Sequence, residues 1–276
     1  MIQVKDVVKS FDGNVVLNHV SANFEDGKVN MIIGQSGSGK TVLMKSMIGL
    51  HQIDGGEIVF DTRAGQQNLA GMTEKEVRML HREVGMLFQG AALFDSMTVQ
   101  ENVMYPLEMF SDMTDKEKVE RARFCLERVN MPERAFGLMP SEISGGMQKR
   151  VAIARAIALN PKYLFCDEPN SGLDPTTSIV IDRLIQEITQ EYNITTIINT
   201  HDMNSVMEIG DKIGFIYKGE KLWEGSNKEI LLSDCKELND FVFASNMAKY
   251  HLTILYKHFP NWWSKNFRLH PTHQLN

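Results

Sequence analysis

Residues 34–41, with the sequence Gly-Gln-Ser-Gly-Ser-Gly-Lys-Thr, have the composition and spacing of a loop that binds phosphate. Its three glycines allow backbone conformations closed to other residues, so successive N–H groups can surround an anion. The ammonium group of Lys40 would then reach the β- and γ-phosphates of a nucleotide, and the hydroxyl of Thr41 would bind Mg²⁺. A glycine-rich turn without a ligand is the alternative. The apolar run at 29–33 and the helix predicted over 41–50 flank the motif, and this context favours a nucleotide phosphate.

Two carboxylates stand at the end of a second apolar run. Residues 163–167 are predicted to form a strand, and Asp167 and Glu168 lie where it ends. Ligands bind at the carboxyl ends of the strands in an open α/β sheet. Asp167 is therefore expected to approach Mg²⁺ through its water shell, and Glu168 to activate the attacking water as a general base. Without the motif at 34–41, two solvated carboxylates in a loop would be the simpler interpretation.

A second helix start has the chemistry of an anion site. Ser144, Gly145 and Gly146 open a predicted helix with one hydroxyl and two glycines. This segment and the loop at 34–41 are not expected to reach one nucleotide within a single subunit. A two-fold dimer, in which each nucleotide lies between one loop of each subunit, would bring them together. A glycine-rich helix cap is the alternative.

Three further side chains complete the candidate site. Gln89 ends a strand predicted at 84–88, where its amide could touch Mg²⁺ or the attacking water. His201 ends a strand predicted over 194–200, where its ring could contact the γ-phosphate. Asp174 closes the segment Ser-Gly-Leu-Asp, which could line the dimer seam. The simpler alternatives are a surface amide, a structural histidine and a plain helix cap.

The elements that must position these residues follow from periodicity and turn signals. Strands alternate with helices over 143–218, which predicts a parallel sheet. Residues 1–33 alternate and turn in the manner of antiparallel strands, and the methionine-rich stretch over 90–142 is predicted to be a helical insertion. Further predictions are turns at 12–13, 26–27 and 218–219, a strand at 58–60, helices at 147–160 and 175–192, and capping boxes at 73–76 and 114–117.

Composition narrows the function classes. The 276 residues suit one compact unit with subdomains, and the net charge of −6 argues against nucleic-acid binding. The sequence has no run of 18 apolar residues and no signal-peptide pattern, so no membrane span is expected. Its three cysteines are widely spaced, which suits a reducing compartment without disulfides. A cytoplasmic protein is therefore predicted.

Taken together, the motifs have the order and spacing found in ABC ATPases, and the chain resembles that family over roughly residues 2–245. The resemblance implies an α/β fold of the P-loop NTPase type, with an ATPase domain over 1–245. This domain would combine a RecA-like core, an antiparallel β-subdomain and an α-helical subdomain inserted at about 90–160. The resemblance also implies ATP and Mg²⁺ as cofactors, and a head-to-tail homodimer that encloses two ATP molecules. The implied activity is hydrolysis of ATP to ADP and phosphate, coupled to transmembrane transport.

The same resemblance assigns roles residue by residue. Glu168 would be the catalytic base, His201 the γ-phosphate sensor, and Gln89 a participant in both catalysis and Mg²⁺ binding. Mg²⁺ would otherwise be held by Thr41 and, through water, by Asp167. Nucleotide-binding residues would be Phe11, Gly34, Gln35, Ser36, Gly37, Ser38, Gly39, Lys40, Thr41, Ser144, Gly145, Gly146 and Asp174. Phe11 would stack on adenine where tyrosine is commoner, and the segment before Ser144 begins with isoleucine where leucine is usual.

A longer segment gives a finer resemblance. Residues 86–103, Met-Leu-Phe-Gln-Gly-Ala-Ala-Leu-Phe-Asp-Ser-Met-Thr-Val-Gln-Glu-Asn-Val, are similar to those of Mla-type (MlaF-like, MCE-associated or toluene-tolerance) lipid-transport ATPases. This implies movement of phospholipid between the inner and outer membranes, powered from the cytoplasmic face of the bacterial inner membrane. The implied partners are an MlaE-like permease and an MCE-domain protein. The alternatives are another ABC importer or exporter, such as one for amino acids or lipoprotein release, and a non-transport ABC ATPase.

The predicted tail at 246–276 differs from the rest of the chain. From residue 250 onward it contains no Asp or Glu, and it carries four histidines together with Trp262 and Trp263. It could contact a neighbouring subunit with the tryptophans as anchors, be a loosely packed terminus, or touch the membrane interface. The histidines lack regular ligand spacing, so a metal site is not expected there.

Overall fold

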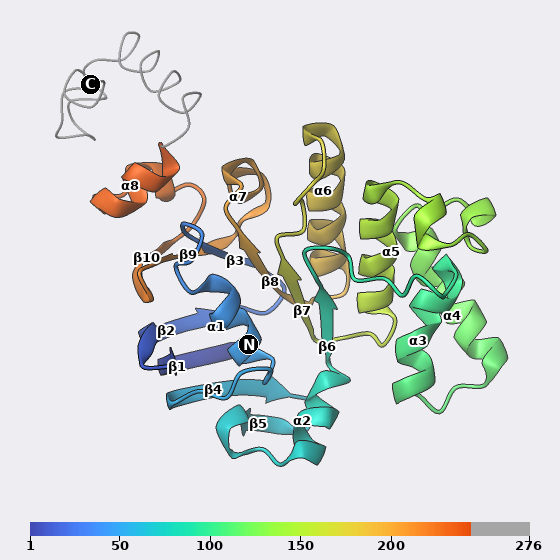
Figure 1. The fold of residues 1–276 in the computed structure, drawn as a ribbon, viewed down its shortest axis with the longest axis horizontal. Helices are drawn as coiled ribbons and strands as arrows, with labels where there is room; N and C mark the ends of the chain where they lie inside the picture. Colours follow the sequence, from blue (N-terminus) through green and yellow to red (C-terminus); the bar gives the residue numbers. More distant parts are fainter. Residues whose placement is uncertain (244–276) are drawn as a thin grey trace, which may run out of the picture.

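Two β-sheets form the framework of the molecule, and the computed structural model describes residues 1–243 (Figure 1). The interpretations of the tail at 246–276 lie outside the described residues. A four-stranded antiparallel sheet has the order β2-β1-β4-β5, and a six-stranded sheet has the order β10-β9-β3-β8-β7-β6. The strands are β1 (Ile2–Phe11), β2 (Asn14–Phe24), β3 (Val29–Ile33), β4 (Gly55–Thr62), β5 (Gly65–Asn68), β6 (Val84–Leu87), β7 (Tyr163–Asp167), β8 (Thr195–Thr200), β9 (Lys212–Tyr217) and β10 (Glu220–Gly225).

Parallel pairing brings the carboxyl ends of the central strands to one edge of the six-stranded sheet. β3 pairs in parallel with β8 and β9, and β7 pairs in parallel with β6 and β8. In this register Ile33 lies opposite Thr200, and Asp167 lies opposite Asn199. The segments that begin after β3, β7 and β8 therefore meet at the same edge, which is where ligands bind in such sheets.

β3 departs from the antiparallel pattern that was predicted over residues 1–33. β1 and β2 form the expected hairpin, with Phe11 opposite Asn14, but β3 belongs to the parallel sheet. All five residues of β3 are buried, which is typical of a central strand that is covered on both faces. The turn at 26–27 therefore connects two sheets and does not close a second hairpin.

Eight helices accompany the sheets within residues 1–243, and most of them begin with a side-chain cap. The predicted capping boxes at Thr73 and Thr114 are confirmed, and a third one at Thr98, which sequence analysis missed, opens α3. No helix within residues 1–243 has the length and hydropathy that a membrane crossing requires. The helices are α1 (Lys40–Met47), α2 (Glu74–His81), α3 (Val99–Phe110), α4 (Asp115–Arg128), α5 (Gly145–Ile157), α6 (Pro175–Glu191), α7 (Met203–Ile209) and α8 (Lys236–Val242), with short 3-10 turns at Leu69–Gly71, Glu133–Ala135, Pro140–Glu142 and Ile230–Leu232.

A glycine ends α1 three residues before the predicted boundary. Gly49 has φ +77°, and the N–H of Leu50 behind it donates to the carbonyl of Lys45 at 2.9 Å. Such a bond satisfies a carbonyl at the helix end and turns the chain away from the helix axis. The local signal for this stop was present in the sequence, because glycine is the residue that most easily takes a left-handed conformation.

Both faces of the six-stranded sheet are covered, because alternate residues of its central strands enter two separate apolar clusters. In β3, Ile32 packs in the cluster formed with α1 and the antiparallel sheet, whereas Met31 packs in the cluster formed with the helices from α3 to α8. Phe165 and Cys166 of β7 divide in the same way. The parallel sheet is thus the middle layer of the molecule (Figure 1).

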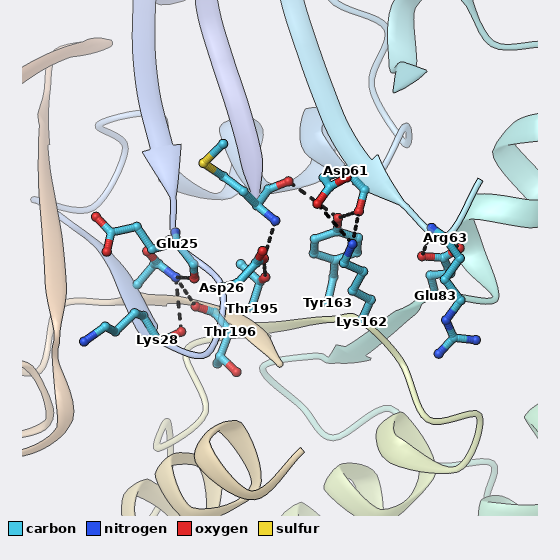
Figure 2. Close-up of polar contacts among 12 residues, drawn as sticks. Glu25, Asp26, Lys28, Asp61, Arg63, Glu83, Lys162, Tyr163, Thr195 and Thr196 are labelled. Atoms are coloured by element: carbon cyan, nitrogen blue, oxygen red, sulfur yellow. Dashed lines mark hydrogen bonds and ion pairs between the residues drawn. The ribbon is translucent and has the colours of Figure 1, made fainter. Parts of the chain in front are cut away.

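Polar contacts tie the antiparallel sheet to the end of the core that lies away from residues 34–41 (Figure 2). The hydroxyl of Tyr163, at the start of β7, donates to the carbonyl of Asp61 in β4 at 2.6 Å. The ammonium group of Lys162 lies 3.3 Å from the Asp61 carboxylate, and the N–H of Arg63 donates to the Glu83 carboxylate at 3.1 Å. Burial raises the pKa of the Tyr163 hydroxyl above its usual value, so this group stays protonated and remains a donor.

Gly85 fixes the distance between edge strand β6 and α5. A Cβ atom at Gly85 would lie 2.4 Å from the carbonyl oxygen of Ala156 in α5. A side chain therefore cannot be added without moving either the strand or the helix. α5 packs with α3 and α4 in one helical unit, so this contact anchors the whole unit to the sheet.

We expect Gly85→Ala to destabilise the fold, because an added methyl group in a filled interface costs about 1–3 kcal/mol. Thermal unfolding followed by circular dichroism should show a fall in Tm of roughly 2–4 °C per kcal/mol. Gly71→Ala is the matched control, because a Cβ atom there meets nothing within 4 Å. Equal Tm values for the two variants would show that the close approach at Gly85 is not tight.

Candidate functional site

The loop at 34–41 joins the end of β3 to the start of α1. Gly34 has φ +149°, and a Cβ atom on it would lie 2.1 Å from the carbonyl oxygen of Ile216 in β9. Gln35, Ser36 and Gly37 form the exposed crest of the loop. α1 begins after Gly39 without a side-chain cap, so its first N–H groups are left for a ligand. The hydroxyl of Ser38 is buried and has no hydrogen-bond partner among the described residues.

Lys40 lies beneath this crest as a buried cation. Its side chain is in the first turn of α1, and the residue is only 7% exposed. The ammonium group donates to the carbonyls of Gly34 and Gln35 at 2.7 and 3.0 Å. Burial lowers the pKa of Lys40, and the nearby carboxylates of Glu168 and Asp167 oppose that shift. The loop is therefore folded around a positive charge whose partners are neutral carbonyls, which suits an incoming anion.

Thr41, Asp167 and Asn199 form a connected polar group at the edge of the sheet. The hydroxyl of Thr41 lies 3.4 Å from a carboxylate oxygen of Asp167. The amide Nδ2 of Asn199 donates to that same oxygen at 2.6 Å and to the Thr41 hydroxyl at 3.1 Å. Asn199 is buried, and its Oδ1 has no hydrogen-bond partner among the described residues. Sequence analysis missed Asn199, although its position two residues before His201 on β8 was a usable signal.

Glu168 and His201 face each other across the ends of β7 and β8. The Nδ1 atom of His201 lies 2.8 Å from Oε1 of Glu168. The carboxylate side chain is 16% exposed and the imidazole is 63% exposed, so the pair borders on solvent. Glu168 adopts φ +48°, an unusual backbone conformation for a residue with a side chain, and its N–H donates to the carbonyl of Asn199 at 2.8 Å. Strained residues of this kind cluster at functional sites.

Gln89 contacts the loop that follows Glu168. Its Nε2 donates to the Ser171 hydroxyl at 3.2 Å, and its backbone carbonyl accepts a bond from the ammonium group of Lys149 in α5. Burial lowers the pKa of Lys149. No hydrogen bond within residues 1–243 joins the Gln89 side chain to Thr41 or Asp167. In this conformation Gln89 is linked to the segment 171–174 and to α5, and the link to α5 was not predicted.

Ser144, Gly145 and Gly146 lie at the start of α5, away from the loop at 34–41. The Ser144 hydroxyl caps α5 by accepting a hydrogen bond from the N–H of Met147. The helix therefore begins at Gly145, two residues earlier than predicted. Ser144 and Gly145 are exposed, and a Cβ atom at Gly146 would lie 2.6 Å from the methyl group of Thr177. Among the described residues, no hydrogen bond connects this segment with residues 34–41. One subunit therefore does not bring the two candidate anion sites together.

Asp174 and Phe11, the remaining predicted site residues, have no hydrogen bond with residues 34–41 among the described residues. Asp174 caps α6, and its hydrogen bonds with Thr177 hold the pKa of its carboxyl below the usual range. Phe11 ends β1, is 38% exposed, and makes an edge contact with His51 at 5.3 Å between ring centroids. The ammonium group of Lys9 lies 5.0 Å from the centroid of the Phe11 ring. The exposed part of the Phe11 ring could stack on a flat aromatic ligand.

Comparison with known proteins identifies relatives along most of the chain. The family model described as ABC transporter matches residues 17–171. The methionine import ATP-binding protein MetN of Campylobacter jejuni is 34% identical over 274 residues, which cover 94% of this chain and 81% of that protein. MetN of Clostridioides difficile is 37% identical over 88% of this chain and 74% of its own length. A probable ribonucleotide transport ATP-binding protein, mkl of Mycobacterium tuberculosis, is 32% identical over 87% of this chain and 66% of its own length.

Solved structures share the fold as well. The dimeric ATP-binding cassette MJ0796, in a post-hydrolysis state bound to ADP and Pi, has a TM-score of 0.74 and 31% identity. That match covers 82% of this chain and 99% of the other. The cbiO1 protein of Clostridium perfringens, part of the transporter complex cbiONQ, has a TM-score of 0.77 and 28% identity over 91% of this chain and 98% of its own. The predicted ABC-type P-loop NTPase fold is thereby confirmed.

We expect Lys40→Ala to lower the affinity of the chain for ADP by about 10–100-fold, because charge-assisted hydrogen bonds contribute roughly 1.5–3 kcal/mol. Isothermal titration with purified protein measures the change. Lys45→Ala is the matched control, because Lys45 lies on the same helix in its last turn. Equal affinity in wild type and Lys40→Ala would contradict the assignment of the loop as the phosphate site.

Proposed function

We propose a mechanism for this chain, which belongs to the ABC transporter family and is an ATP-binding and ATP-hydrolysing subunit. The observation that carries the proposal is the meeting of the buried Lys40, the Thr41 hydroxyl and the Glu168–His201 pair at one sheet edge. The peptide groups of residues 34–39 and the start of α1 bind the phosphates. Phe11 stacks on the adenine ring.

The Glu168 carboxylate acts as the general base for the attacking water. Its position at the carboxyl end of β7 faces the phosphate side of the sheet, and His201 holds the carboxylate in one orientation through a 2.8 Å contact. Because the imidazole is largely exposed, it can also reach a γ-phosphate that enters from solvent. Proton removal by a positioned side chain accelerates such reactions by about 10²–10⁴-fold.

The donor set around Thr41 fits Mg²⁺. The Thr41 hydroxyl and the Asp167 carboxylate lie together, with the Asn199 amide nitrogen donating to both, and oxygen ligands are those that Mg²⁺ prefers. Thr41 would bind the ion directly, and Asp167 would do so through water. Bound Mg²⁺ would neutralise charge on the β- and γ-phosphates. Gln89 would join this group by exchanging its bond with Ser171 for one with the ion or the attacking water.

ATPases of this family work as dimers with membrane permeases, and the separation of the two anion sites in one subunit supports a head-to-tail arrangement here. Ser144, Gly145 and Gly146 of one subunit would cover the nucleotide on residues 34–41 of the other. Asp174 would lie at the seam, since Thr177 beside it packs on Gly146. Closure on ATP and reopening after hydrolysis would drive the permease.

Import of a small solute, with an amino acid as the first candidate, is the transport function that the relatives favour. The two MetN proteins are methionine import ATP-binding proteins, and they align with most of this chain. In this proposal the chain is a peripheral subunit at the cytoplasmic face of a bacterial inner membrane, and its partner is an importer permease.

Phospholipid transport is a second candidate, and it rests on the segment at 86–103. Phe88 and Phe94 of this segment are 39% and 40% exposed, which suits contact with a permease. The expected MlaE-like permease and MCE-domain protein draw no support from the relatives, whose names refer to methionine and ribonucleotide transport. The finer Mla-type assignment therefore stays a hypothesis.

Glu168→Gln should retain ATP binding and lower the turnover number by about 100-fold or more, because an amide has the shape of the carboxylate but is not a base. Phosphate release measures turnover, and size-exclusion chromatography with ATP should show accumulation of the dimer. Glu57→Gln, on β4, is the control for the same chemical change at an exposed site. Steady-state turnover equal to that of wild type would remove Glu168 from the role of base.

The transport proposal predicts that a polytopic permease co-purifies with the affinity-tagged chain from detergent-solubilised native membranes. Mass spectrometry identifies the partner and any bound lipid. An importer permease whose complex shows ATPase activity stimulated by an amino acid would support the first candidate. An MCE-domain protein and phospholipid in the complex would favour the second, and recovery of no membrane protein would contradict a transport role.

A further inference from the structure

A buried carboxylate lies behind the Glu168–His201 pair and takes no part in the mechanism described above. Asp182, in the second turn of α6, is 3% exposed. The Nδ2 atom of Asn170 donates to its Oδ1 at 2.8 Å, and the same nitrogen donates to the hydroxyl of Ser205 at 2.9 Å. Ser205 belongs to α7, which lies beside α6 on the same face of the sheet (Figure 1).

The two residues held by this contact follow the two members of the Glu168–His201 pair, Asn170 in the loop after β7 and Ser205 in the first turn of α7. Asn170 follows Glu168 by two positions, in a tight turn where the N–H of Ser171 donates to the Glu168 carbonyl at 3.1 Å. Ser205 follows His201 by four positions, and its hydroxyl lies 3.4 Å from the Asp202 carboxylate. The segments after β7 and β8 thus meet twice, once at the Glu168–His201 contact and once at the contact between Asn170 and Ser205.

Packing alone does not account for an acid at this position. Within residues 1–243 Asp182 has no ion pair with Lys, Arg or His, and a buried carboxylate without such a partner is unfavourable. Burial raises the pKa of Asp182 to about 6, while hydrogen bonds from Ser205 and Asn170 oppose the shift and the carboxylates of Asp202 and Glu208 add to it. The Asn170 amide donates to this carboxyl at 2.8 Å, and the bond is charge-assisted whenever the carboxyl is ionised.

We propose that Asp182 is a positioning residue for ATP hydrolysis, which fixes the loop after Glu168 against the start of α7, just after His201, through Asn170 and Ser205. The inference rests on the proposed function of Glu168 and His201. Asp182 is buried, so it would not itself touch the nucleotide or Mg²⁺. It acts by holding the carboxylate and imidazole in the orientation that water activation needs, and it also restrains Ser171, the residue that Gln89 contacts.

The test is the steady-state kinetics of Asp182→Asn in the full-length chain. The amide keeps the size of the carboxylate but loses its charge and one acceptor, so we expect kcat to fall about tenfold while the Kd for ATP stays within about twofold. Glu187→Gln is the matched control on the same helix, where the carboxylate faces Arg128 at the surface. A kcat equal to that of the control would overturn the proposal.

A charge swap separates positioning from simple damage to the fold. Asn170→Asp combined with Asp182→Asn restores an amide–carboxylate pair in the reverse sense, and we expect it to recover most of the lost kcat. Ser205→Ala approaches the same contact from α7 and should also lower kcat without changing the Kd for ATP. If Asp182→Asn fails to fold, wild-type kcat in Ser205→Ala would still refute the proposal, as would failure of the swap in a folded double variant.

Glu168→Gln measured in parallel separates failure of the Asp182 hypothesis from failure of the function proposed for Glu168 and His201. Loss of turnover in Glu168→Gln together with normal turnover in Asp182→Asn would refute only the inference about Asp182. Normal turnover in Glu168→Gln would refute the proposed function of the site itself, whatever Asp182→Asn does.

Discussion

The parallel pairing of β7 and β8, in the register that sets Asp167 opposite Asn199, is the constraint on which the rest of the site depends. It fixes where both strands end, so Glu168 and His201 can touch although 33 residues separate them. The pairing of β3 with β8 adds the loop at 34–41 to the same edge. A slip of one residue between β7 and β8 would turn alternate side chains to the opposite face and separate these groups.

The electrostatics of this edge follow from burial. Lys40 is one cation close to Asp167 and Glu168, and its hydrogen bonds go to carbonyls and not to these carboxylates. The carboxylates are engaged elsewhere, Asp167 by Asn199 and Glu168 by His201. Because the opposite charges are held apart by separate partners, the cation is not neutralised in place and can attract a phosphate.

Sequence predicted what depends on local chemistry. The limits of β7, the capping boxes at Thr73 and Thr114 and the loop at 34–41 follow from residue order alone, and the structure agrees. Contacts between distant segments were harder to foresee. The entry of β3 into the parallel sheet, and the roles of Asn199 and Asp182 as hydrogen-bond partners, depend on strand order and on which faces meet. The place of Asn199 near the end of β8 hints at a role, but only the assembled sheet shows that this strand pairs with β7 and sets Asn199 opposite Asp167.

The close approach at Gly85 gives α5 the geometry of a lever. The helix is pressed against β6 near Ala156, at its carboxyl end, Ser144 lies at its amino end, and the ammonium group of Lys149 between them donates to the backbone carbonyl of Gln89. At a rise of about 1.5 Å per residue, Ser144 lies roughly 18 Å and Lys149 roughly 10 Å from that fulcrum. A tilt of α5 by about 10° would therefore move Ser144 by about 3 Å and Lys149, which contacts Gln89, by about 2 Å. A displacement of Ser144 would in this way be passed through Lys149 to Gln89, at the edge of the sheet, reduced in proportion to the two distances along α5.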